Sequence, residues 1–326
     1  MNKVLVTGAT GMLGFNIVKG LQARGREVRA LVRSIPKGQK LLGDTCEFVQ
    51  GDLEDLDSIR TAMKGCKVVY HAAGLPEQWQ KDEDIFRRVN TEGTKNIVKV
   101  ALEEDVQRFI YSSTIDVFEG HRGKEYDEST IDAQPKGTAY ERSKQEADRV
   151  VVEAMEKGLP AIFLHPSAIY GPGPSGRNGP NGLFVRLANG EIPMLLPGGF
   201  PVVYSEDVAE GHILAEEKAE VGSRYILSES YWSLTQLVQQ AVFALKLRKC
   251  PPTMPLWVAK LVAWAGMLFS RITNKPPLIA SGELHFLQWQ AIPSSAKAQK
   301  ELDWRPKAFE EGLQETIRFL ELGPKS

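Results

Sequence analysis

The fold is decided by Val4-Leu5-Val6-Thr7-Gly8-Ala9-Thr10-Gly11-Met12-Leu13-Gly14, an apolar run that ends in three glycines and leads into an apolar-periodic helical pattern. A strand that turns through glycines into a helix lets the backbone approach a phosphate, and the free amides of the helix then face the anion. The spacing is GxxGxxG, which differs from the GxGxxG of the commonest dinucleotide fingerprint. A tight turn without a ligand is the alternative. We expect this turn to hold a pyrophosphate through Gly8, Thr10, Gly11, Met12, Leu13 and Gly14.

The segments after this turn alternate between short apolar runs and helical patterns. Runs typical of buried parallel strands lie at Lys3–Val6, Val28–Val32, Cys46–Gln50, Val68–His71, Phe109–Ser112 and Ala161–His165. Helical patterns lie between them at Leu13–Ala23, Leu56–Met63, Thr91–Glu104 and Ala139–Lys157. This alternation predicts an α/β fold with a doubly wound parallel (Rossmann) sheet, whose ligands bind beyond the carboxyl ends of the strands.

The pattern changes near Tyr170, where a segment rich in Gly and Pro covers residues 171–182. Such a segment is either a linker or a functional loop. Strands are predicted beyond it at Pro201–Tyr204 and Ser223–Leu227, and helices at Val208–Glu217, Leu234–Leu245, Leu256–Arg271 and Phe309–Leu320. We expect residues 1–170 to form a dinucleotide-binding domain that carries the catalytic residues. Residues 171–326 are expected to form a smaller α/β lobe that mainly binds the substrate, with some segments returning to the first sheet.

Composition and charge exclude several classes of protein. Forty Lys and Arg against 41 Asp and Glu give a net charge of −1, so we expect no strong electrostatic footprint for nucleic acid or for an anionic membrane. The three cysteines, Cys46, Cys66 and Cys250, form no CxxC motif or Cys/His cluster, so we expect neither a disulfide framework nor a metal site. We expect no secretory signal, and the most apolar stretch, Leu256–Phe269, is too short to span a bilayer. The protein is therefore expected in the cytoplasm.

The end of the second predicted strand indicates which nicotinamide cofactor fits. NAD-specific sites usually carry Asp or Glu there, about 20 residues after the glycines, to hold the ribose hydroxyls. Here the strand ends Ala30-Leu31-Val32-Arg33-Ser34, without a carboxylate. Arg33 is placed to bind a ribose 2′-phosphate because a guanidinium group matches phosphate geometry, and Arg29 and Ser34 are weaker candidates. A solvated surface arginine is the alternative. The sequence thus predicts NADP(H) rather than NAD(H).

Tyr140 and Lys144 are spaced as a catalytic pair. In Tyr140-Glu141-Arg142-Ser143-Lys144 the first and last side chains share one face of a predicted helix. A free tyrosine, with a pKa of about 10, is a poor acid or base at neutral pH, whereas an ammonium group beside it favours the phenolate. Hydroxyl side chains also cluster upstream in Ser112-Ser113-Thr114, at the end of a predicted strand.

Together these motifs resemble the short-chain dehydrogenase/reductase superfamily, in its extended, epimerase/dehydratase-like type. The resemblance covers nearly the whole chain, and its pattern is most similar to dihydroflavonol reductases and hydroxysteroid dehydrogenase-like ketone reductases. The segments that carry it are, in chain order, Thr7–Gly14, Gly51-Asp52-Leu53, His71-Ala72-Ala73-Gly74, Val89–Thr94, Tyr140–Lys144 and His165–Gly173.

The resemblance implies a role for residues within each segment. It makes Tyr140 the proton donor or acceptor and Lys144 the residue that holds the nicotinamide ribose and tunes Tyr140. Thr114, with Ser113 as its nearest substitute, would bind the substrate oxygen. The family's last segment usually begins Arg-Pro, whereas His165 stands here before the proline, and we expect it to be structural. Further contacts with the cofactor are implied for Asp52 and Leu53 by the adenine, Ala72 and Ala73 under the cofactor, and Pro166 and Ser167 by the nicotinamide.

Extended members of this superfamily either epimerise or dehydrate nucleotide sugars with a tightly held NAD, or reduce ketones with NADPH. Arg33 stands where NAD-binding members carry an acidic residue, and the run Arg29–Arg33 is similar to the corresponding run of dihydroflavonol reductases. The segment Val202–His212 also resembles the reductases, but it discriminates only weakly between reductases and epimerase-like proteins. We expect reduction of a ketone on a fairly apolar small molecule to a secondary alcohol, or the reverse. One alternative is a non-catalytic dinucleotide-binding sensor. Another is a nucleotide-sugar epimerase or dehydratase, whose diphosphate could be bound by Arg177, Arg186 and Lys246.

Two further surfaces bear on partners. The helical pattern at Leu256–Arg271 carries an apolar stripe, which usually packs into a core; a lid over an apolar substrate or a surface that touches a membrane is the alternative. In similar proteins Thr91–Glu104 and Ala139–Lys157 pair in a four-helix homodimer interface, unless their apolar side chains face the protomer's own sheet. The stripe consists of Trp257, Leu261, Trp264 and Leu268, and the candidate dimer residues are Val98, Ala101, Leu102, Ala147, Val150 and Val151.

Overall fold

A parallel sheet of seven strands forms the centre of the computed structural model, which describes residues 3–174, 179–273, 277 and 281–322. The strands follow the order β3-β2-β1-β4-β5-β7-β10, and every neighbouring pair is parallel. This arrangement confirms the predicted doubly wound α/β fold. The strands are β1 (Lys3–Thr7), β2 (Val28–Val32), β3 (Glu47–Gln50), β4 (Cys66–His71), β5 (Arg108–Ser112), β7 (Ala161–Pro166) and β10 (Arg224–Leu227).

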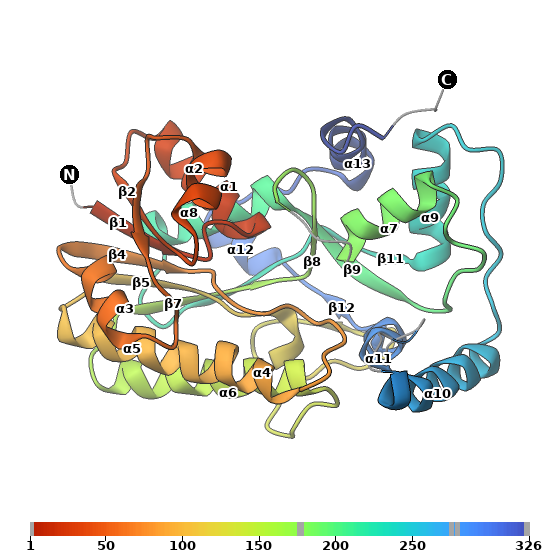
Figure 1. Cartoon of the computed structure of the whole chain (residues 1–326), viewed down its shortest axis with the longest axis horizontal. Coiled ribbons are helices and arrows are strands. Elements are labelled where there is room, and N and C mark those ends of the chain that lie inside the picture. Colours follow the sequence, from red (N-terminus) through yellow and green to blue (C-terminus); the bar gives the residue numbers. More distant parts are fainter. Residues whose placement is uncertain (1–2, 175–178, 274–276, 278–280, 323–326) are drawn as a thin grey trace.

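The sheet separates two layers of helices because successive side chains of a strand point to opposite faces. On β1, Val4 and Val6 belong to the core on one face, and Leu5 belongs to the core on the other. In Figure 1 one layer lies above the sheet and the other below it. The upper layer contains α1 (Met12–Ala23), α2 (Ile35–Leu42) and α8 (Ser205–Lys218), and the lower layer contains α3 (Leu56–Met63), α5 (Gly93–Glu103) and α6 (Ala139–Glu156).

The local sequence explains two departures from the predicted elements. α2 was not predicted, but the Ser34 side chain accepts a hydrogen bond from the Lys37 amide and caps it. The helix expected at Thr91–Glu104 begins at Gly93, after α4 (Asp84–Phe86) and a π-helical turn, η1 (Arg87–Glu92). In that turn the Asn90 side chain donates to the Leu75 carbonyl and accepts from the Leu75 amide, which fixes the loop after β4.

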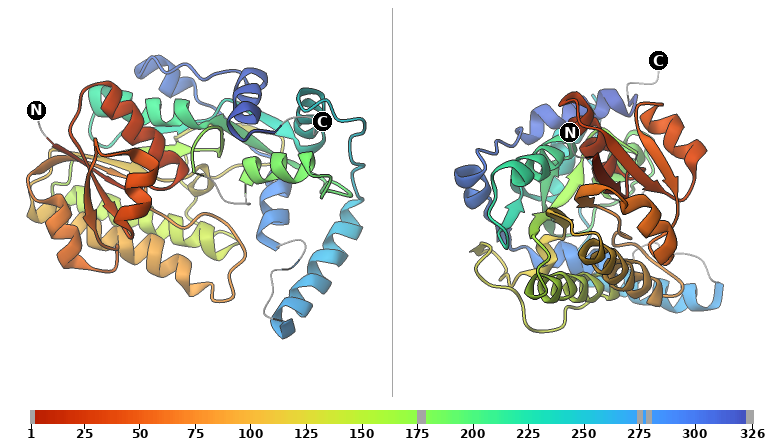
Figure 2. Two further views of the ribbon diagram at one scale, coloured as in Figure 1. Left: turned by 45° about the horizontal axis from the view of Figure 1, so that its top comes forward. Right: turned by 90° about the vertical axis from the view of Figure 1, so that its left-hand side faces the viewer.

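The later part of the chain both completes the first sheet and builds a second one. β10 pairs with β7, and α8 packs against α1. In the second sheet, β9 (Gly199–Tyr204) pairs parallel with β8 (Ala168–Tyr170) and antiparallel with β11 (Ser230–Ser233). The helices that contact this sheet are α7 (Gly179–Ala188), α9 (Leu234–Ala244), α11 (Ser281–Trp289) and α13 (Phe309–Phe319). α10 (Leu256–Thr273) packs against α11 and extends away from the sheet, as Figure 2 shows.

Short elements join the two parts. β6 (Glu125–Tyr126) pairs with β12 (Ile292–Pro293), and α12 (Ala296–Glu301) packs against β10. A single 3-10 turn, η2 (Ile115–Val117), follows β5. Among the described residues, no helix has both the length and the hydropathy to cross a membrane. The cytoplasmic location stays a prediction.

Candidate active site

The glycine turn after β1 is built so tightly that two of its three glycines are needed for packing. A Cβ atom on Gly14 would lie 2.3 Å from the Gly8 carbonyl oxygen, and one on Gly8 would lie 2.7 Å from the Ala72 carbonyl oxygen. Gly8 also has a φ of +73°, which favours glycine. The turn therefore packs directly against Ala72 and Ala73 at Gly8. The structure thus brings Gly8, Ala72 and Ala73, all predicted to contact the cofactor, together.

Gly11 is different, because the protein itself does not require a glycine there. It is exposed, caps α1 without a side-chain hydrogen bond, and a Cβ atom on it would meet only the Gly8 carbonyl oxygen at 3.3 Å. The first turn of α1 contains no acidic residue. An open helix N-terminus with small side chains fits the pyrophosphate of a dinucleotide. The buried Ser167 hydroxyl, which has no hydrogen-bond partner among the described residues, is a second polar group that fits a bound cofactor.

The other residues predicted to contact a cofactor lie at the carboxyl ends of strands. Leu53 is buried against Gly93, whereas Asp52 is exposed and its carboxylate accepts a hydrogen bond from the Glu54 amide. Pro166 is the last residue of β7, and Ser167 follows it. Thr10, Met12 and Leu13 line the turn and the first residues of α1 and are partly exposed.

Arg33 and Arg29 have different environments although both lie on or beside β2. Arg29 is tied to the Glu47 carboxylate at 2.9 Å and donates to the carbonyls of Ala62 and Lys64, so it cannot assist at a ribose phosphate. Arg33 is exposed and forms neither an ion pair nor a hydrogen bond with the described residues. Of the basic groups weighed for this role, Arg33 is therefore the one left free to bind a phosphate.

Tyr140, Lys144 and Thr114 meet where β5 ends. A capping box between Thr138 and Glu141 starts α6 and places Tyr140 in its first turn. The Lys144 ammonium is buried and donates to the Ser112 carbonyl at 2.9 Å. The Thr114 side chain is hydrogen bonded to the Tyr140 phenol. Ser113, the substitute considered for Thr114, donates instead to Asp148 at 2.9 Å.

The pKa of Tyr140 differs from the expectation that Lys144 would favour its phenolate. Burial raises the pKa of Tyr140 well above the usual value of a tyrosine, and the charges of Asp116 and Glu77 raise it further. Burial also lowers the pKa of Lys144 to about 8. Tyr140 is therefore protonated at neutral pH, chiefly because burial disfavours its phenolate and secondarily because the charges of Asp116 and Glu77 do so too.

Asp116 is the member of the site that the sequence reasoning missed. Thr114 donates to one oxygen of its carboxyl group at 2.7 Å, and the other oxygen has no partner among the described residues. Burial raises the pKa of Asp116 to about 7, and the charge of Glu141 adds to the effect. Burial likewise raises the pKa of Glu77 to about 7. The sequence offered one signal that could have identified Asp116, namely an acidic residue two positions after Thr114.

Replacing Asp116 by Asn is expected to stabilise the protein at high pH. The pKa of Asp116 is about 3.9 in the unfolded chain and about 7 in the folded protein. In the wild type the free energy of unfolding is therefore highest below pH 4 and falls by up to about 4 kcal/mol as the pH rises from 4 through 7. The free energy of urea unfolding at pH 4, 6 and 8 should show the variant gaining on the wild type as pH rises. In the exposed control Asp127→Asn the sign is opposite, because hydrogen bonds from Ser129 lower the pKa of Asp127. A gain of Asp116→Asn that does not depend on pH would contradict this account.

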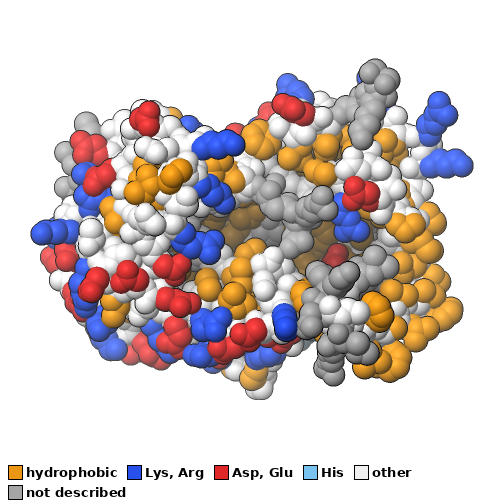
Figure 3. All heavy atoms as spheres, viewed as in Figure 1, with side chains coloured by type: hydrophobic (Ala, Val, Ile, Leu, Met, Phe, Trp, Pro, Cys, Tyr) orange, Lys and Arg blue, Asp and Glu red, His pale blue; other side chains and the backbone are white. Residues whose placement is uncertain are grey.

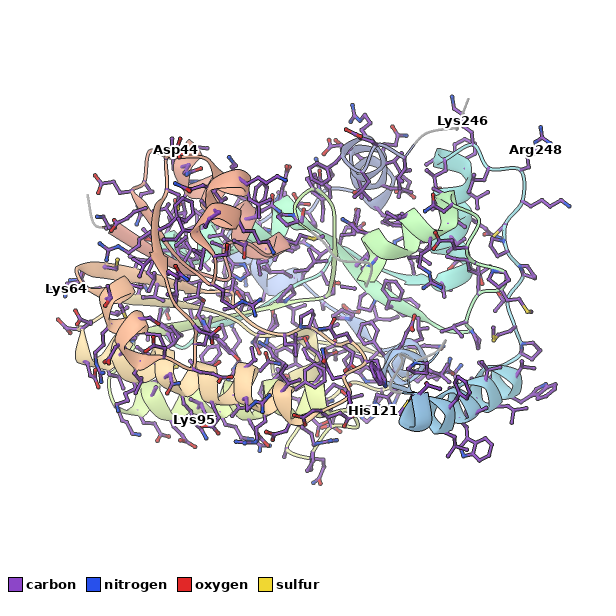
Figure 4. The ribbon with its side chains drawn as sticks, in the orientation of Figure 1. Asp44, Lys64, Lys95, His121, Lys246 and Arg248 are labelled. Atoms are coloured by element: carbon purple, nitrogen blue, oxygen red, sulfur yellow. The ribbon has the colours of Figure 1, made fainter. Side chains whose placement is uncertain are left out.

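Other residues singled out in the sequence fall into two groups. His165 is buried between the Thr114 carbonyl at 3.1 Å and Arg224, as expected for a structural residue. Of the basic residues considered for a diphosphate, Lys246 is exposed at an edge of the molecule (Figure 4), and Arg186 is half-buried on α7. Arg177 lies outside the described residues.

The residues considered for a dimer interface lie on α5 and α6, but most of them face inward. Only Leu102 and Val150 are partly exposed, and they border a shallow groove with Lys99 and Glu153. A homodimer across these helices therefore has a smaller apolar surface than expected, and it stays a prediction. The buried residues, which pack on the protomer's own sheet, are Val98, Ala101, Ala147 and Val151.

Comparisons with known proteins agree with this geometry. A putative dihydroflavonol 4-reductase of Synechocystis sp. is 27% identical over 97% of this chain and 94% of its own length. A ketoreductase of Stigmatella aurantiaca, named for a 3-oxo-4-farnesyl-dihydroquinoline-1-oxide substrate, is 33% identical over 52% of this chain and 51% of its own length. The crystal structure of gox2253 superimposes with a TM-score of 0.83 at 29% identity and covers 98% of both chains.

The family comparison covers the glycine turn, the Tyr140–Lys144 pair and all seven strands of the central sheet. Residues 4–227 match the model described as NAD dependent epimerase/dehydratase family. The match extends over well more than half of the chain. The protein belongs to the NAD dependent epimerase/dehydratase family, the extended type of short-chain dehydrogenases/reductases.

Proposed function

We propose that this protein is an NADPH-dependent reductase that converts a ketone on a fairly apolar small molecule to a secondary alcohol, or runs the reverse reaction. The observation that carries the proposal is the group formed by Thr114, Tyr140 and Lys144 at the carboxyl end of β5, which β4 separates from the strand that leads into the glycine turn. A protonated phenol suits the reductive direction, because it can give a proton to the oxygen that becomes an alkoxide.

The residues of the site have separate tasks in this mechanism. A bound nicotinamide dinucleotide would supply the hydride, and the glycine turn and Arg33 would hold its phosphates. Tyr140 protonates the substrate oxygen, and Thr114 would turn its hydroxyl proton from the Asp116 carboxyl group to the same oxygen. Lys144, fixed by the Ser112 carbonyl, stabilises the negative charge that develops on the phenol oxygen. These interactions strengthen as charge appears, which is what accelerates a reaction.

An apolar ketone is the substrate class that the surroundings favour. Figure 3 shows a hollow between the two parts of the molecule, lined in part by hydrophobic side chains. Among the relatives, one ketoreductase is named for a farnesylated substrate. The test is the oxidation of NADPH, followed by absorbance, with a panel of aromatic, terpenoid and steroid ketones. Turnover of none of them would reject the proposal.

Replacing Arg33 by Ala is expected to raise the KM for NADPH by about 10- to 150-fold and to leave the KM for NADH nearly unchanged. A hydrogen bond to a charged group contributes about 1.5–3 kcal/mol, and only NADPH carries the 2′-phosphate that would accept it. Lys37→Ala, at an exposed basic residue on α2, is the matched control and should change neither KM. Equal effects of Arg33→Ala on both cofactors would remove Arg33 from the cofactor site.

The alternatives from the sequence give different results in one measurement. An epimerase or dehydratase of the family would retain NAD through purification, whereas a reductase exchanges NADPH with solution. The nucleotide released on denaturation therefore separates them: stoichiometric NAD favours the nucleotide-sugar reaction. A binding protein without activity would bind NADPH, but none of the ketones in the panel would cause it to oxidise the bound NADPH.

A further inference from the structure

We propose that the outer face of α10 is a docking surface for a bilayer of anionic phospholipids. The helix turns its large apolar side chains away from the protein, the reverse of an ordinary amphipathic helix. Trp257 is 69% exposed and Trp264 is 64% exposed. The buried residues of α10 are small, namely Ala259, Ala263 and Ser270, and Leu256 and Val262 pack partly against the same core. The outer face, which we call the α10 face, consists of Trp257, Leu261, Trp264, Leu268 and Phe269.

The α10 face is contiguous and lies at the edge of the molecule. Trp257, Leu261, Trp264 and Leu268 recur at helical spacing, so their side chains share one side of the helix, and Phe269 lies next to that side. Figure 3 shows hydrophobic side chains gathered along this edge, and Figure 2 shows α10 projecting beyond the rest of the protein. Large exposed apolar surfaces of this kind mark sites of interaction. Tryptophan is the residue enriched at the boundary between the acyl chains and the headgroups of a membrane.

The charge around the α10 face decides which partner covers it. Residues 230–282 contain six basic side chains and no Asp or Glu, although the whole chain has a net charge of −1. Lys260 is exposed on α10 itself, and Lys246, Arg248 and Lys249 are exposed between α9 and α10. In Figure 4, Lys246 and Arg248 lie at the right-hand end of the molecule, as α10 does, but at the upper corner of that end, whereas α10 lies at the lower corner. Basic residues beside an apolar face attract anionic lipid headgroups.

A second copy of this chain fits the α10 face less well than a bilayer. Two copies related by a two-fold axis would bring two sets of these cations together without acidic partners from the same segment, because residues 230–282 supply none. An anionic bilayer supplies many negative charges and an apolar layer at once. The proposal does not depend on which reaction the active site performs.

The face also lies close, along the chain and in space, to the candidate active site. α10 packs against α11. On α11, a Cβ atom at Gly282 would lie 2.6 Å from a carboxylate oxygen of Glu77, and His285 lies 3.6 Å from the Glu141 carboxylate. One helix therefore separates the α10 face from the carboxylates beside Tyr140. A protein docked through α10 would hold that side of the site near the bilayer surface.

The test is flotation of the full-length protein with vesicles of phosphatidylcholine alone or mixed with phosphatidylglycerol. We expect binding to the mixed vesicles, weaker binding to the neutral ones, and partial release by salt. The double variant Trp257→Ser/Trp264→Ser should bind at least tenfold more weakly. Phe319→Ser, at a 48% exposed aromatic residue on α13, is the matched control and should bind as the wild type does.

A second pair of variants tests the charge. Arg248→Gln/Lys249→Gln should weaken binding to the mixed vesicles by about fivefold for each charge removed, and Lys64→Gln, at the opposite end of the molecule (Figure 4), should not. All of these positions are exposed, and circular dichroism verifies that each variant is folded. The proposal is overturned if wild type and tryptophan variant bind vesicles equally or not at all. It is also overturned if sedimentation shows a dimer that the tryptophan variant abolishes, since a second copy would then cover the face.

Discussion

Replacing Tyr140 by Phe should lower kcat on the order of 10²–10⁴-fold while NADPH still binds, because the variant loses only the proton that the phenol supplies. The ring itself stays in place, since it packs edge-on against Phe86 with ring centres 6.0 Å apart. Steady-state kinetics give kcat, and quenching of protein fluorescence gives the Kd for NADPH. We expect the Kd to change by less than a factor of three.

The matched control is Tyr225→Phe on β10. Its ring is buried, and its hydroxyl group, which the substitution removes, donates a hydrogen bond to Glu301. This change costs some stability and leaves kcat intact, because Tyr225 lies away from the end of β5. If Tyr140→Phe retained the wild-type kcat, the proton would come from another group. Asp116, which is buried and has a pKa raised to about 7, would be the first to examine.

Replacing Gly14 by Ala should weaken dinucleotide binding on the order of 10²-fold or more and destabilise the protein. The added methyl group would lie 2.3 Å from the Gly8 carbonyl oxygen and 2.9 Å from the Ala9 Cα atom, and neither is a flexible side chain that could move aside. The turn therefore has to open. Forcing extra carbon into a packed region typically costs about 1–3 kcal/mol. Fluorescence titration with NADPH and urea unfolding measure the two effects.

Gly11→Ala separates binding from stability at the same turn. Its methyl group would meet only one backbone atom, at 3.3 Å, so the free energy of unfolding should change by less than about 1 kcal/mol. Binding of NADPH should still weaken, because the methyl group occupies the space in front of α1. If both glycine variants bound NADPH as the wild type does, the turn would not be the phosphate site.

The fold could be predicted from the sequence because its signals are local. The glycine turn and the alternation of apolar runs with helical patterns depend on residues that are neighbours in the chain. The environments of Arg29 and Arg33 could not be predicted this way. Arg29 is held by Glu47 because the register of β2 and β3 places the two residues side by side, and this pairing is a property of the folded sheet.

The stripe on α10 shows the limit of periodicity. Its spacing predicts a face, but both sides of the helix are apolar, so the pattern could not tell which side packs inward. Of the alternatives left open, a stripe packed into the core is excluded for Trp257 and Trp264, because these two side chains are exposed and Ala259 and Ala263 are buried instead. Asp116 was missed for a related reason. Its raised pKa comes from burial, which only the folded chain provides.

The position of β10 at the end of the central sheet constrains how the protein is made. β10 consists of Arg224–Leu227, so a nascent chain cannot finish its largest sheet until most of its length has left the ribosome. Until then β7 is an open edge that can pair with other chains, and Asp148, buried on α6, lacks the guanidinium group of Arg224 that lies 2.7 Å from it in the finished fold. Synthesis of the first 170 residues alone should therefore yield an aggregating fragment.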